Sequence, residues 1–148
     1  MHNIETLKLK GELQVVLNKA DGSVETHDFK NLVVNTGLNF IVSRMKDATA
    51  TAMTHMELGT GTTAAAAADT TLVTAISGSR TALTSTTVSS NTITYVASFA
   101  AGTGTGAVTE AGIFNAASAG TMLCRTVFSV VNKGANDTMT ITWAVTVN

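Results

Sequence analysis

The sequence has no proline, one cysteine and no long apolar run. The single cysteine, Cys124, excludes an intrachain disulfide framework. No apolar run approaches the ~20 residues that span a bilayer as a helix, so we expect no membrane partner. The first residues, MHNIETLKLKGE, carry charges where a signal peptide needs its apolar region, so we expect synthesis in the cytoplasm without export. The net charge of -1 provides no general attraction to nucleic acid.

Charge is also scarce in most of the chain. Residues 1–58 hold 13 of the 19 charged side chains, and the last ninety residues hold the other six: Asp69, Arg80, Glu110, Arg125, Lys133 and Asp137. Threonine, by contrast, occupies 27 of the 148 positions, and its β-branched side chain favours strands. The sequence therefore predicts a β-rich body whose exterior is either hydrated by Thr, Ser, Asn and Gly or covered by a partner.

Alternating side chains indicate strands along most of the chain. Leucine and valine occupy odd positions from Leu7 to Leu17, and the turn at residues 20–23 predicts a hairpin that returns through residues 24–34. Gly11 interrupts the first strand and predicts a bulge or bend there. Later strands are expected at residues 52–58, 80–88, 92–100, 110–114, 121–131 and 138–147. About eight such strands in one domain, residues 1–148, are typical of an antiparallel all-β sandwich or barrel.

One short helix is expected at about residues 36–47. Asn35 and Thr36 resemble a helix cap, and apolar side chains then recur on one face, at Leu38, Ile41, Val42 and Met45. The five alanines at 64–68 lie between Gly and Thr residues, which favours a loop over a second helix.

The segment HMELGTGTTAAAAADTTL admits two interpretations, a phosphate cradle or an ordinary turn. A Walker-type loop needs a lysine directly after its last glycine. Gly61 is followed by threonines and alanines, and the first lysine after it is Lys133. A dinucleotide-binding loop needs a third glycine at a set spacing and a following helix, and Gly59 and Gly61 lack that third glycine. We therefore interpret the segment as a tight connection between strands.

Sites of chemistry are not indicated elsewhere. The three histidines, His2, His27 and His55, lack the short spacing of metal ligands, so we expect neither a metal ion nor another cofactor. Cys124 lies within an apolar strand, as a buried small side chain does. Glu110, at the start of a strand, is expected to hold a loop by accepting backbone N–H groups. Trp143 follows the apolar register of its strand and is expected in the core. We therefore expect the protein not to be an enzyme.

Taken together, several segments resemble small structural proteins of tailed bacteriophages. The resemblance covers nearly the whole chain and lies in NLVVNTGLNFI, HMELGTGTTAAAAADTTL, STTVSSNTITYVASF, GAVTEAGIFNAASAGTMLCRTVFSVV and the closing TITWAVTV. Sequences with this order are similar to head decoration, or cement, proteins, which have a jelly-roll body. Similar sequences are also labelled tail-fibre or collar proteins. None of these motifs implies a catalytic residue.

The resemblance implies a structural virion protein on the outer surface of the capsid, with the major capsid protein and further copies of itself, as a dimer or trimer, as partners. A surface of small uncharged side chains suits such contacts, because backbones can approach without burying unpaired charges. An arm of residues 1–6 and the two glycine-threonine loops are the expected contact elements: Met1, His2, Asn3, Ile4, Leu7, Leu9, Gly59, Thr60, Gly61, Thr62, Thr63, Gly102, Thr103, Gly104 and Thr105. A receptor- or glycan-binding tail component is the alternative.

Overall fold

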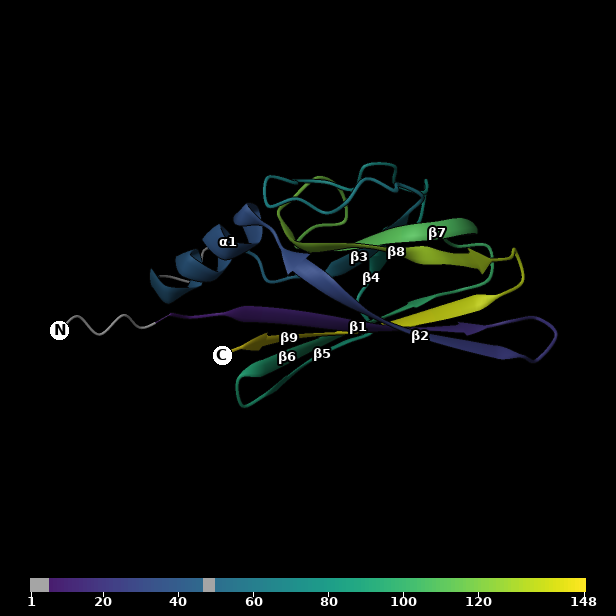
Figure 1. The fold of residues 1–148 in the computed structure, drawn as a ribbon, viewed down its shortest axis with the longest axis horizontal. Helices are drawn as coiled ribbons and strands as arrows, with labels where there is room; N and C mark the ends of the chain where they lie inside the picture. Colours follow the sequence, from purple (N-terminus) through teal and green to yellow (C-terminus); the bar gives the residue numbers. More distant parts are fainter. Residues whose placement is uncertain (1–5, 47–49) are drawn as a thin grey trace.

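The computed structural model describes residues 6–46 and 50–148, which form nine strands and one helix (Figure 1). In chain order the elements are β1 Leu9–Asn18, β2 Val24–Val33, α1 Asn35–Lys46, β3 His55–Gly59, β4 Thr81–Ala82, β5 Ser85–Ser89, β6 Thr92–Phe99, β7 Gly106–Phe114, β8 Met122–Lys133 and β9 Thr138–Val147. The all-β antiparallel class, the opening hairpin and the single short helix are confirmed.

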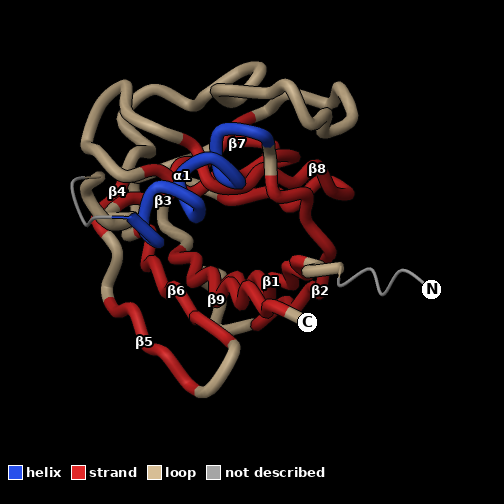
Figure 2. Tube along the Cα trace, turned by 90° about the vertical axis from the view of Figure 1, so that its left-hand side faces the viewer, coloured by secondary structure: helices blue, strands red, loops and turns tan. Residues whose placement is uncertain are grey.

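The strands form one curled antiparallel sheet with the order β4-β3-β7-β8-β2-β1-β9-β6-β5, a half-barrel of jelly-roll-like form. Two chain segments bend from one half of the sheet to the other. The first is β2, which pairs with β1 up to Asn31 and then with β8 through Leu32 and Val33. The second is residues 81–89, which supplies both edge strands, β4 and β5. Figure 2 looks along this curled sheet from the end that carries α1.

The core lies inside the curl because the alternation places every second residue there. Tyr95, Trp143 and Leu13 face one another across β6, β9 and β1, and each is at most 4% exposed. Trp143 and Cys124 are both fully buried, as expected from their registers. Fully burying a side chain such as leucine contributes about 1.5–3 kcal/mol, so this core provides much of the stability.

The outer face of β3, β7 and β8 is covered as well. Residues 60–79, which we call the covering loop, pass over this face (Figure 1). Leu72 from the covering loop packs with Val34, Phe114 and Met122 in a second, smaller apolar cluster. The strand at 121–131 is apolar on both faces, which predicts a central strand, and this prediction is confirmed because β8 lies between β7 and β2. Residues 122–126 are buried on both sides, whereas Val130 is 51% exposed.

Helix α1 lies at the end of the curled sheet where β1 begins (Figure 1). It sits very close to β8, because a Cβ added at Gly37 would lie only 2.0 Å from the carbonyl oxygen of Leu123. The hydroxyl of Thr36 donates to the carbonyl of Met122 rather than capping the helix, so the expected capping role of Thr36 is wrong. This hydroxyl instead fixes the first turn of α1 to β8.

Two further expectations are corrected. Gly11 marks no bulge, because the pairing of β1 continues through it without a shift in register. The glycine is required instead by Asn31, whose side chain occupies the space above it, only 1.3 Å from where a Cβ would stand. The strand expected at residues 52–58 is β3, which begins only at His55 and ends at Gly59. Residues 64–68 form a turn and loop, as expected.

Candidate functional site

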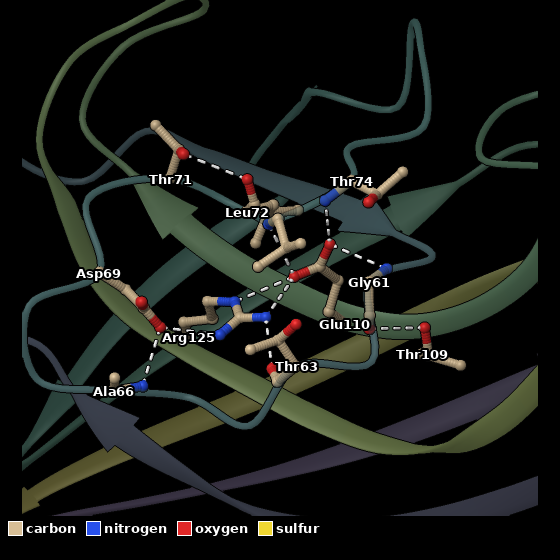
Figure 3. Close-up of polar contacts among 11 residues, drawn as sticks. Gly61, Thr63, Ala66, Asp69, Thr71, Leu72, Thr74, Thr109, Glu110 and Arg125 are labelled. Carbon is tan, nitrogen blue, oxygen red and sulfur yellow. Dashed lines mark hydrogen bonds and ion pairs between the residues drawn. The ribbon is translucent and has the colours of Figure 1, made fainter.

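The polar centre of the molecule is the carboxylate of Glu110, which is fully buried under the covering loop. It accepts the backbone N–H groups of three residues of that loop: Thr74 at 2.7 Å, Gly61 at 3.0 Å and Val73 at 3.1 Å (Figure 3). Glu110 stands on β7 with its side chain on the outer face of the sheet. The expectation that this carboxylate holds a loop through backbone N–H groups is therefore confirmed.

Arg125, on the adjacent strand β8, completes this centre and is also fully buried. Its Nε and Nη2 donate to one oxygen of Glu110 at 2.9 and 2.8 Å. Its Nη1 donates to Asp69 at 2.7 Å, and Nη2 also donates to the carbonyl of Thr63 at 2.9 Å. One guanidinium thus joins the sheet to both ends of the alanine-rich part of the covering loop (Figure 3).

These contacts determine the charge state of the two carboxylates. Burial alone raises the pKa of Glu110, but the N–H of Thr74 and the guanidinium of Arg125 outweigh it and hold the pKa below its ordinary value. The pKa of Asp69 is lowered first by the N–H of Ala66 and then by Arg125. Both carboxylates are therefore ionised at neutral pH. A general acid must carry a proton to donate, and an ionised carboxylate carries none.

The glycines of GTGTT are explained by the same centre. A Cβ at Gly59 or at Gly61 would lie 2.5 Å from an oxygen of Glu110, so only glycine lets the backbone approach this carboxylate. The loop N–H groups that could cradle a phosphate are occupied by the protein's own carboxylate. The segment is thus a tight connection between strands, as expected, and its geometry is that of a structural anchor.

A second candidate region is the end of the curled sheet next to α1. A pocket of about 350 Å³ opens there between the helix and the strands. Phe40 and Ile41 of α1 form one wall, and Ile93, Tyr95 and Val145 of β6 and β9 form another. Tyr95 is 4% exposed, and its burial raises its pKa to about 12, so its hydroxyl is neutral at physiological pH.

The outer side of α1 at this end is apolar and uncovered. Leu38, Val42 and Met45, which we call the apolar stripe, are 40%, 64% and 84% exposed. The sequence predicts that these three residues share one apolar face with Ile41. In the structure only Ile41, of these four, packs against the core. The sheet covers the arc that contains Gly37, Phe40 and Ile41, and the apolar stripe lies about a third of a turn further around the helix.

The expected contact residues do not gather on one surface. Leu9 pairs with Val147 at the end next to α1, whereas residues 102–105 follow β6 at the opposite end. Thr60, Thr62 and Thr63 are exposed on the covering loop, and Leu7 is 73% exposed. Their contact with a partner stays a prediction.

The glycines among the expected contact residues are not all accessible. Gly59, Gly61 and Gly104 are buried against the protein itself, and Gly102 is exposed. The first four expected contact residues, Met1, His2, Asn3 and Ile4, lie outside the described residues.

The remaining candidates for chemistry are placed in structural contacts. The imidazole of His55 contacts the hydroxyl of Thr54 at 2.7 Å. Glu57 pairs with Arg80, whose guanidinium lies 3.6 Å above the ring of Phe114. Among residues 6–46 and 50–148, no group of three or more His, Cys, Asp or Glu side chains could hold a metal ion.

Sequence reasoning missed the role of Arg125. A signal for it exists: arginine inside the apolar run TMLCRTVFSVV is costly to bury without a partner, and Glu110 is the carboxylate of the neighbouring strand. The apolar stripe was identified as apolar, but its exposure was not predicted.

Comparison with protein-family models, with curated proteins and with solved structures finds no match to this chain. Across residues 6–46 and 50–148, no helix has the length and apolar character needed to cross a membrane.

Proposed function

We propose that this chain is a structural virion protein of a tailed bacteriophage, which binds the capsid shell as a decoration protein. The observation that carries the proposal is the apolar stripe on α1. Exposed apolar side chains that share one face of a helix and have no partner within their own chain mark a protein contact surface. The resemblance of the sequence to phage decoration proteins identifies the shell as the expected partner.

The chemistry of α1 also indicates what this partner surface carries. The charged residues of α1 are Arg44 and Lys46, both basic and both in its last turn. Two copies of α1 packed against each other would bring basic side chains together unless the copies run in opposite directions. A partner surface with carboxylates around an apolar centre fits both the apolar stripe and these charges. We therefore assign the apolar stripe to the capsid protein and the self-association of the chain to another surface.

A variant pair tests this proposal. Val42→Glu places a charge in the apolar stripe, and Val24→Glu makes the same change at an exposed position, 59% accessible, in the hairpin at the opposite end. We expect Val42→Glu to lower the occupancy of DNA-filled heads at least tenfold and Val24→Glu to leave it unchanged. Equal occupancy for both variants, measured by quantitative mass spectrometry of purified heads, contradicts the assignment of this surface.

The location of the protein in the particle tests the function itself. We expect the chain in DNA-filled heads, at regular positions on the shell in an electron-microscopy map. Its presence in purified tails and its absence from heads would favour the tail-fibre or collar alternative. A glycan-binding role has less support, because such sites use exposed aromatic rings and all seven aromatic side chains are buried or half-buried.

A further inference from the structure

The pocket between α1 and the curled sheet has a chemistry distinct from that of the apolar stripe. Its walls are mostly apolar, with Phe40 and Ile41 on the helix and Ile93 and Val145 on the strands, and the polar turn at residues 90–92 also lines it. Its volume of about 350 Å³ lies within the range of small-molecule sites, roughly 300–1,000 Å³. The mouth of a curled sheet is also a common place for such sites. A recess of this size accepts a small apolar molecule more readily than a folded partner.

One charged group marks the rim of this pocket. Arg44 is the only charged residue among those that line it, all of which belong to the described part of the chain. Its Nη1 donates to the carbonyl of Ala50 at 2.7 Å, which orients the guanidinium at the end of α1. Among residues 6–46 and 50–148, none of the residues that line the pocket is acidic, and the guanidinium is a planar group that binds carboxylates well.

We propose that this pocket binds a monocarboxylate with an unbranched apolar chain of medium length. The chain lies against Phe40, Ile93 and Val145, and the carboxylate pairs with Arg44 at the rim. The ligand chain would lie on the inner side of α1, whereas the proposed attachment to a capsid uses the apolar stripe on its outer side, so the two proposals share only Arg44. Tyr95 forms a wall of the pocket and pairs in register with Trp143, the only tryptophan of the chain, so binding also changes the tryptophan fluorescence.

Titration calorimetry with three probes of equal chain length tests the proposal: decanoate, decanol and decyltrimethylammonium, each kept below the concentration at which it aggregates. We expect decanoate to bind one molecule per chain, at least tenfold more tightly than either other probe. Arg44→Gln should weaken decanoate binding about tenfold and leave decanol binding unchanged, because only the charged contact is removed. Lys10→Gln removes an equal charge from an exposed position on β1 and should change neither.

A second variant tests the location of the site. Val147→Trp fills the pocket and should abolish binding of decanoate, with the fold checked by thermal unfolding; Ile93→Trp serves the same purpose if the first variant does not fold. Equal affinity for the three probes, unchanged decanoate affinity in Arg44→Gln, or decanoate binding that survives in a folded pocket-filling variant each overturns the proposal. Neither titration requires a capsid, so failure here leaves the proposed attachment untouched.

Discussion

The covering loop and helix α1 differ in whether their side chains find partners within the protein. Under the covering loop two fully buried ions, Glu110 and Arg125, have partners within the chain for their charges and for many of their hydrogen-bonding atoms. On α1 the side chains of the apolar stripe stay 40% to 84% exposed, with no covering segment among residues 6–46 and 50–148. The difference indicates that the first region serves the stability of this protein alone. The second leaves an apolar surface exposed, which the proposed attachment would cover.

Removing the charge partner should have the largest effect on this comparison. Arg125→Met leaves Glu110 buried without its counter-ion and should lower the free energy of unfolding by about 3–5 kcal/mol. Denaturant unfolding measures this change. Lys10→Met, which breaks an exposed ion pair with Glu12, is the matched control and should have little effect.

The ion pair itself can be separated from the cost of an orphaned charge. In the double variant Glu110→Gln/Arg125→Met neither ion is left alone, so the loss should be smaller than the sum of the two single losses. Additive losses would show that the two side chains stabilise the covering loop independently, against the geometry of their contact.

Pushing α1 away from the sheet should have the next largest effect. Gly37→Ala forces a methyl group against the carbonyl oxygen of Leu123 and should destabilise the protein by about 1–3 kcal/mol. Thermal unfolding checks this value, with Asn39→Ala on the exposed side of the same helix as control. A loss confined to Gly37→Ala shows that close approach, rather than helix propensity, sets the position of α1.

Lowering the pH should destabilise the covering loop less than the preceding substitutions destabilise the protein, because Arg125 remains in place. Glu110 and Asp69 have a lower pKa in the folded protein than in the unfolded chain. Their contribution is therefore fully present above the unfolded values, near pH 4, and is lost as the pH falls through the folded values. The protection factors of the Gly61 and Thr74 amides, which compare hydrogen exchange with its intrinsic rate at each pH, should fall over that interval. In Glu110→Gln these protection factors should depend less on pH, and an unchanged pH profile would argue against this carboxylate.

The smallest effect is expected on the apolar stripe. Met45 is 84% exposed, so Met45→Gln should change the free energy of unfolding by no more than about 0.5 kcal/mol. The same change at Met56, which is fully buried, should cost about 2–5 kcal/mol. A large loss at Met45, measured by denaturant unfolding, would mean that the stripe already has a partner in the chain or in a second copy.

Patterns of period two carried most of the correct predictions from sequence. The alternation of TMTITWAVTV places Trp143 and Met139 inside, and both are fully buried. Glu110, at the start of an apolar strand, was expected to hold a loop by accepting backbone N–H groups, and it accepts that of Gly61. The alternation succeeds because a strand's own pleat decides on which face of the sheet each of its residues lies.

Predictions failed where distant segments meet. The apolar pattern of α1 shows an apolar arc but not how much of it the sheet covers, and the approach of Gly37 to Leu123 settles that. Gly11 was expected to mark a bulge or bend because it interrupts the alternation of the first strand. The side chain that requires a glycine there, Asn31, lies on another strand and left no local pattern. The contact of Arg125 with both Asp69 and Glu110 likewise depends on the path of a twenty-residue loop that no periodic pattern describes.

The segment 81–89 links the two edges of the sheet, because it contains both edge strands, β4 and β5. Leu83 donates its N–H to Thr54 beside β3, and the next residue, Thr84, donates to Val96 on β6. One short stretch thus forms both borders of the sheet, with only two residues between β4 and β5. A slip in the alignment at one border would have to be matched at the other, since no slack separates them. Both borders are also short, with two residues in β4 and five in β5, and a short edge offers another chain little backbone to pair with.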